Sequence, residues 1–173
     1  MRMPGLVTRH PLGAAALALA GVATVVFALL FFEPQALFID DRVNEALPTA
    51  TAQQRETSRV VHEPRELGRG GFRGLAHDAS GMALLIEVEG KRYLRFEDLH
   101  VDNGPDLKVY LSPEPASSEE GAFDDRIVSL GDLKGNIGDQ NYEIPANVDL
   151  DRFRSAVVWC ERFGVGFAVA PIG

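Results

Sequence analysis

The sequence predicts an all-β domain, a sandwich or barrel of about seven or eight strands, preceded by one N-terminal transmembrane helix. Two observations support this architecture. Residues 12–32 form an apolar run without a charged side chain, and residues 66–173 contain short apolar runs separated by Gly, Pro, Asn and Asp. Short runs bounded by turn-forming residues are typical of strands, and no stretch after residue 66 shows the 3.6-residue period of an amphipathic helix.

The run over residues 12–32 predicts a membrane anchor that contacts the lipid bilayer. At about 1.5 Å of rise per residue, a helix of this length crosses a hydrocarbon core about 30 Å thick. Arg2 and Arg9 precede the run and acidic residues follow it, which predicts a single-pass cell-membrane protein with residues 1–11 in the cytoplasm and the rest outside. The alternative is a cleaved signal peptide, but its apolar region is normally only about 7–15 residues long and ends at a small-residue site. The run here ends in Phe-Phe-Glu-Pro.

Residues 33–65 are expected to form a juxtamembrane stalk or linker. Residues 43–47 could make a short helix that Pro48 ends. The polar tract over residues 49–59 contains few apolar side chains and is typical of a linker.

Residues 66–173 are expected to form the extracytoplasmic β-domain. Residues 83–89 and 91–96 predict a hairpin with a type II′ turn at Gly90-Lys91, because glycine tolerates a positive φ. Residues 107–111 alternate between apolar and polar, which predicts a half-buried strand. The other predicted strands are residues 127–130, 142–144, 156–160 and 163–169.

The composition excludes several classes of protein. The chain has 173 residues, with 17 Lys and Arg against 25 Asp and Glu, so its formal net charge is -8. A nucleic-acid-binding protein would carry a basic surface, and we therefore expect no nucleic-acid partner. The single cysteine excludes a disulfide within one chain and any cluster held by several thiolates.

Several local patterns resemble known sites but lack their spacing. The glycines between residues 68 and 74 do not match a dinucleotide-binding loop, and a glycine-rich start to a strand is favoured. Residues 102–106 lack the twelve-residue spacing of a calcium loop, which favours a turn. The four histidines show no metal-ligand spacing and no serine lies in a nucleophile elbow, so we expect neither a metal site nor a hydrolase.

Four separated motifs resemble the electron-transfer DM-thirteen domain, a family of β-rich extracellular modules. They are GGFRGLAHDASGMALLI, NGPDLKVYLS, LGDLKGNIGDQNYEIP and VVWCERFGVGFAVAPI. The resemblance implies a redox role at the cell surface through a nearly invariant cysteine, which corresponds to Cys160. It allows this cysteine to act as a bare thiol or as a ligand of a prosthetic group such as haem.

The residues alone leave the role of Cys160 open. A cysteine in an apolar strand is commonly a buried small hydrophobe, whereas a reactive thiol needs partial exposure and positive surroundings. His77 is either a loop histidine that bonds to the local backbone, or a partner of Cys160 as proton acceptor or second haem ligand. Trp159 and Tyr142 are expected to be core and turn residues rather than electron relays.

The favoured function is a membrane-anchored extracytoplasmic electron-transfer domain centred on Cys160, with His77 as its candidate partner. Haem is the cofactor that the resemblance allows, and an extracytoplasmic redox or surface protein is the expected partner. We do not expect a stand-alone enzyme. The alternative is a non-catalytic binding or interaction module of the cell envelope, in which the cysteine is structural.

Overall fold

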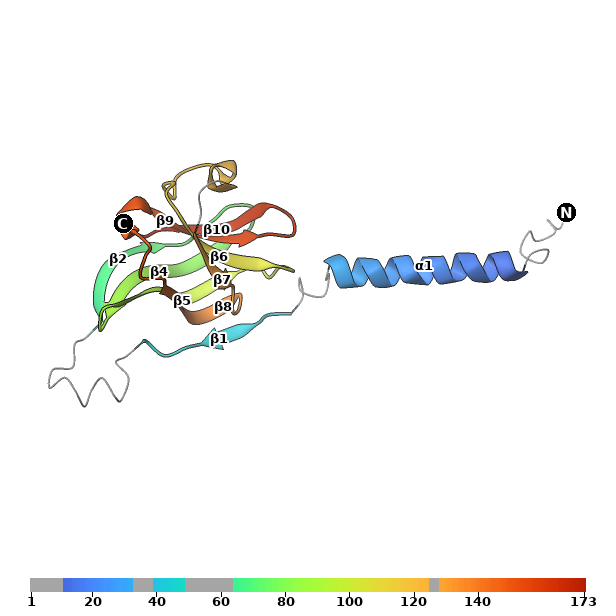
Figure 1. Ribbon diagram of the computed structural model, residues 1–173, viewed down its shortest axis with the longest axis horizontal. Coiled ribbons are helices and arrows are strands. Elements are labelled where there is room, and N and C mark those ends of the chain that lie inside the picture. Colours follow the sequence, from blue (N-terminus) through green and yellow to red (C-terminus); the bar gives the residue numbers. More distant parts are fainter. Residues whose placement is uncertain (1–10, 33–38, 49–63, 125–127) are drawn as a thin grey trace. The chain divides into compact units, whose positions relative to one another are not determined.

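The computed structural model describes residues 11–32, 39–48, 64–124 and 128–173. The chain divides into two compact units, Met1–Gln35 and Ala36–Gly173. The first unit contains the helix α1 (Pro11–Phe32), and the second contains the β-domain (Figure 1).

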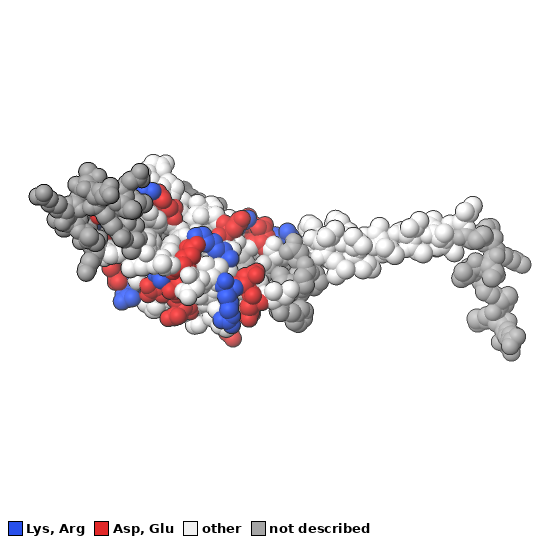
Figure 2. Space-filling view, turned by 90° about the horizontal axis from the view of Figure 1, so that it is seen from below, with Lys and Arg blue, Asp and Glu red and all other residues white. Residues whose placement is uncertain are grey.

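The segment Leu12–Phe32 of α1 is long and apolar enough to cross a membrane. The helix consists mainly of Ala, Leu, Val and Phe, so it has no polar face that would need water. The hydroxyl of Thr24 donates to the carbonyl of Ala20 at 2.9 Å, so this polar group is satisfied within the helix. Figure 2 shows no charged surface on α1, whereas charges of both signs lie on the β-domain.

The β-domain is a sandwich of two five-stranded sheets, with strand orders β1-β8-β5-β4-β2 and β3-β10-β9-β6-β7. The all-β prediction is confirmed, and the described residues contain ten strands instead of seven or eight. Their bounds are β1 (Arg42–Asn44), β2 (Arg65–Gly71), β3 (Arg73–Gly74), β4 (Ala79–Val88), β5 (Lys91–Val101), β6 (Leu107–Ser112), β7 (Val128–Asp132), β8 (Ile137–Ile144), β9 (Ser155–Cys160) and β10 (Val165–Pro171). Within the described residues, the 3-10 helices η3 (Glu120–Asp124) and η4 (Leu150–Arg152) lie in the connections.

The strand β9 shows how the two faces of the second sheet are covered. Ala156, Val158 and Cys160 belong to the core cluster between the sheets. Val157 and Trp159 belong to a second cluster on the opposite face, which includes a phenylalanine of η3. Successive side chains of a strand point to opposite faces. Because both faces of this sheet are covered, all six residues of β9 are buried.

The strand predicted over residues 107–111 is confirmed as β6, but the prediction that it is half-buried is wrong, because its outer face is also covered. Tyr110 and Leu111, on opposite faces of β6, are both buried. Alternation in the sequence reports polarity but does not report whether a connecting segment lies over the outer face.

The predicted hairpin is confirmed, but its predicted turn is wrong. Val88 pairs with Lys91, so the turn residues are Glu89 and Gly90. Both have positive φ, 50° and 76°, as a type I′ turn requires. The predicted start of the last strand at residue 163 is also wrong, because Phe163 lies in the turn between β9 and β10.

The short helix predicted over residues 43–47 is wrong, because Arg42–Asn44 forms β1, which pairs in parallel with β8. The polar tract predicted as a linker lies outside the described residues. The described residues 39–48 of the expected stalk therefore contribute a strand to the β-domain.

Candidate functional site

The candidate functional site lies at the end of the sandwich where β9 meets β10. Cys160 is the last residue of β9, and its register partners are Val165 of β10 and Leu107 of β6. The turn over residues 161–164 follows, and the N–H of Gly164 donates to the carbonyl of Cys160 at 2.9 Å.

Cys160 is a free cysteine with 0% of its surface exposed. Its side chain belongs to the apolar core cluster between the sheets, together with Leu107 and Phe167. Thiol–disulfide exchange requires that one sulfur reach another, so the thiol cannot react while this end of the core is closed.

The loop over residues 102–106 lies against this end of the core. The carbonyl of Asp106 accepts from the N–H of Glu161 at 3.0 Å, which joins the loop to the turn after Cys160. A Cβ on Gly104 would stand 3.0 Å from the ring of Phe167, so the absence of a side chain lets the loop approach the core. The predicted turn in this segment is present at Pro105 and Asp106.

His77 reaches the same end from the connection between β3 and β4. Its Nδ1 lies 3.0 Å from Oδ2 of Asp102, and its ring stacks on Phe167 with a centroid separation of 4.0 Å. The prediction of a backbone partner is therefore wrong, because the partner is the Asp102 carboxylate. The histidine packs against Phe167, which shares the core cluster with Cys160.

The comparison with protein families decides the identity of the domain. The model of the family Electron transfer DM13 matches residues 71–172, which include Cys160, His77 and the 102–106 loop. The chain belongs to the electron transfer DM13 family. The resemblance in the four motifs is thereby confirmed. Comparison with curated proteins and with solved structures gave no match.

The described residues of this DM13 domain do not fit a haem held by Cys160 and His77. The Cys160 thiol is enclosed by apolar side chains and has no exposed surface. His77 is held by Asp102 at one ring nitrogen and by Phe167 at one ring face. A haem ligand needs open space at the coordinating atom for a large planar group, and the closed core at Cys160 does not provide it.

A pair of polar side chains, Tyr110 of β6 and Glu161 of the turn after Cys160, lies on the outer face of the second sheet. The phenol of Tyr110, on β6, donates to the carboxylate of Glu161. Burial of Tyr110 and this hydrogen bond raise its pKa to about 12. Neither residue type signals this pair in the sequence, because the contact depends on how β6 lies against β9 and the turn that follows it.

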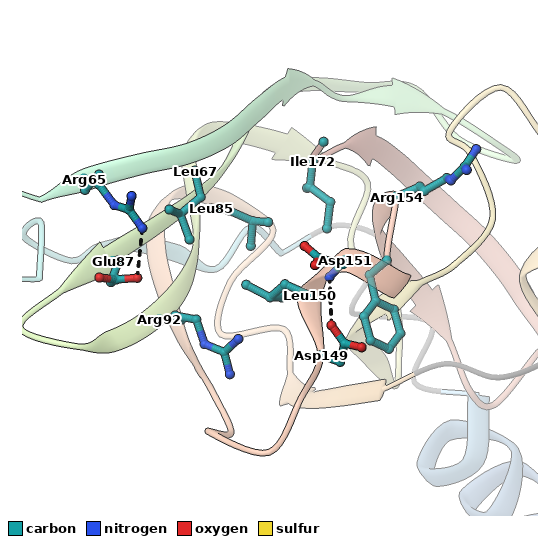
Figure 3. A pocket seen from close by; sticks show the side chains of 12 residues that line it. Arg65, Leu67, Leu85, Glu87, Arg92, Asp149, Leu150, Asp151, Arg154 and Ile172 are labelled. Carbon is teal, nitrogen blue, oxygen red and sulfur yellow. Dashed lines mark hydrogen bonds and ion pairs between the residues drawn. The ribbon is translucent and has the colours of Figure 1, made fainter.

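A pocket of about 750 Å³ lies at the other end of β9 (Figure 3). Leu67, Leu85, Leu150 and Ile172 gather at its centre, and Arg65 pairs with Glu87 at its rim at 3.4 Å. The backbone N–H of Ile172 donates to the carbonyl of Arg154, just before β9 begins, which separates this pocket from Cys160 by the length of the strand.

Proposed function

We propose that the protein is a membrane-anchored electron-transfer domain that works on the extracytoplasmic side. Membership of the DM13 family supports the electron-transfer role. The apolar helix α1 supports the anchor, and Arg2 and Arg9 before it support an N-terminus in the cytoplasm. The single cysteine cannot form a disulfide within the chain, so the electrons are exchanged with an extracytoplasmic redox or surface protein.

Within this function we propose Cys160 as the redox residue, acting as a bare thiol that local opening exposes. The observation that carries this proposal is the position of Cys160 at the very end of β9, under one loop and one turn. Short surface connections open with a smaller free energy than the whole domain. Once exposed, the Cys160 thiolate attacks a disulfide of the partner, forms a mixed disulfide and releases the partner's other sulfur as a thiolate.

The rate at which a maleimide labels the folded full chain tests this proposal. The matched control is Val158→Cys in a Cys160→Ala background, because Val158 lies on the same face of β9 and is equally buried, two residues from the end. Cys160 should react faster than the control thiol after correction for each variant's free energy of unfolding. Equal corrected rates would mean that only global unfolding exposes Cys160, and would contradict the proposal.

His77 is proposed to act as a positioning residue that keeps this end closed. Its contacts with Asp102 and Phe167 hold the 102–106 loop against the core. His77→Ala should therefore speed the labelling of Cys160 and leave the labelling of the Val158→Cys control unchanged. An equal acceleration of both thiols would indicate a general loss of stability instead.

One observation favours the alternative, a non-catalytic binding or interaction module with a structural cysteine. Cys160 is completely buried in an apolar cluster, the common environment of a cysteine that serves as a small hydrophobe. The labelling experiment separates the two functions, because the alternative requires no local opening at Cys160.

A further inference from the structure

Tyr110 differs from Tyr142 in the group that receives its phenolic hydrogen bond. Tyr110 donates to the carboxylate of Glu161, which is a base. Tyr142 donates to the carboxamide oxygen of Gln140 at 2.6 Å, which is an extremely weak base. The ammonium of Lys134 also lies 5.2 Å from the centroid of the Tyr142 ring, where its charge opposes the loss of an electron.

The acid–base partner matters because a phenol that loses one electron becomes a strong acid. The proton must leave as the electron leaves, since a positively charged phenol is costly in a site with little water. Tyr110 is 8% exposed and packs in the outer cluster with Trp159. The ring of Tyr110 is therefore largely buried, and its phenolic proton has a receiving base in place in Glu161, an exposed residue of the turn after β9.

We propose that Tyr110 and Glu161 form a proton-coupled redox pair, which deepens the proposed electron-transfer function and rests on it. In the forward step one electron passes from Tyr110 to an external strong one-electron oxidant, of the class of a high-valent haem. The phenolic O–H bond breaks and the proton binds the Glu161 carboxylate. A neutral tyrosyl radical and a neutral carboxylic acid remain.

The charged groups near the phenol also follow from the structure. Glu161 and Asp106 carry negative charge, and Lys108 carries positive charge, with its Nζ 2.9 Å from Asp106. Lys108 also pairs with Asp132, so two carboxylates share its charge, and Glu161 is the carboxylate that accepts the phenolic hydrogen bond.

Oxidation of the full chain by photogenerated ruthenium(III) tris-bipyridyl tests the proposal, with electron paramagnetic resonance to identify the radical. In a Tyr93→Phe background, which removes the partly exposed third tyrosine, the chain should give a tyrosyl radical, Tyr110→Phe should lose it, and the matched control Tyr142→Phe should keep it. Glu161→Gln removes the base from an exposed position and should slow tyrosyl formation by about 100-fold, the usual contribution of a positioned proton acceptor. A tyrosyl signal that survives in Tyr110→Phe, or an unchanged rate in Glu161→Gln, would overturn the proposal.

The same experiment in Cys160→Ala separates this proposal from the role of Cys160. A tyrosyl radical that forms equally well in Cys160→Ala supports the Tyr110–Glu161 pair, whatever the labelling of Cys160 shows. Loss of the radical in a folded Cys160→Ala variant would assign the oxidation to the thiol and contradict the independent role of Tyr110.

Discussion

Gly138 and Val43 approach so closely that a Cβ on Gly138 would stand 2.0 Å from the carbonyl oxygen of Val43. Gly138 also has a φ of +102°, which other residues rarely adopt. This contact joins β8 to β1, and the neighbouring N–H of Glu45 donates to the carbonyl of Asp139 at 2.9 Å. The attachment of β1 to the sheet therefore depends on a glycine at position 138.

Gly138→Ala should destabilise the domain more than a matched glycine substitution does. Gly131 is the control, because its φ of +105° is nearly the same but no described atom lies within 4 Å of the place of its Cβ. Gly131→Ala should cost about 1–2 kcal/mol for backbone strain alone. Gly138→Ala must in addition displace Val43, and amide exchange of Glu45 should increase. Equal losses of unfolding free energy in urea would contradict this account.

The lowered pKa of Glu45 makes the stability of the β1 attachment depend on pH. Partial burial raises the pKa of Glu45, but hydrogen bonds from Lys134 and Asn141 outweigh burial, so the pKa lies below its ordinary value. Its contribution to stability is therefore present above the unfolded-state pKa of about 4.3 and is lost as the pH falls through the lower folded-state pKa.

Glu45→Gln should weaken this pH dependence. The variant should be less stable than the parent at neutral pH, and the difference should shrink as the pH falls through about 4. Thermal melting of both proteins at a series of pH values measures the effect. Parallel melting curves across the acid range would show that the Glu45–Lys134 contact does not contribute.

The sequence predicted the strands that contain several apolar side chains but not β1, for a physical reason. Strands such as β4 and β9 bury several apolar side chains, so the apolar runs in the sequence indicate where these strands lie. β1 has three residues and no period, and contacts remote in the sequence fix its place. One of these is the bond from the N–H of Asp41 to the amide oxygen of Asn136, 95 positions away, at 2.7 Å.

In the candidate site, too, some features were predictable from the sequence and others were not. Residue type and family resemblance identified Cys160 and His77, which the structure places near the same end of the sandwich. The hydrogen-bond partner of each candidate side chain was not predictable, because strand register and loop approach decide it. Asp102 beside His77 and Glu161 beside Tyr110 are the two cases.

In the turn between β4 and β5, substitutions at two adjacent positions should change the stability of the domain in opposite directions. Glu89 holds a φ of 50°, which asparagine adopts more readily, so Glu89→Asn should stabilise the domain by a few tenths of a kcal/mol, about 0.5. Gly90→Val should cost about 1 kcal/mol or more, because a β-branched residue resists the φ of 76°. Urea denaturation of the two variants measures both effects, and a neutral Gly90→Val would contradict the turn geometry.

The proposed anchor predicts the fate of the N-terminus and the side on which the β-domain lies. Protease added outside intact cells should digest the region after residue 33, and the purified chain should retain residues 12–32. Protection of the β-domain until the membrane is opened would reverse the orientation. A mature chain that begins just after residue 32 would identify the helix as a cleaved signal sequence.

The final prediction concerns the packing of Cys160. Cys160→Ala removes one sulfur atom from a core with 0% exposure and should lower the free energy of unfolding through the small cavity that it leaves. Cys160→Ser keeps the size but places a hydroxyl in the same apolar cluster, which should cost about 1–3 kcal/mol when the hydroxyl finds no partner. The expected order of melting temperatures is therefore parent, then Ala, then Ser. A Ser variant that melts with or above the Ala variant would show that the hydroxyl finds a polar partner or water at this position. In that case the thiol of the parent would also lie in a more polar and more accessible environment than its apolar neighbours indicate.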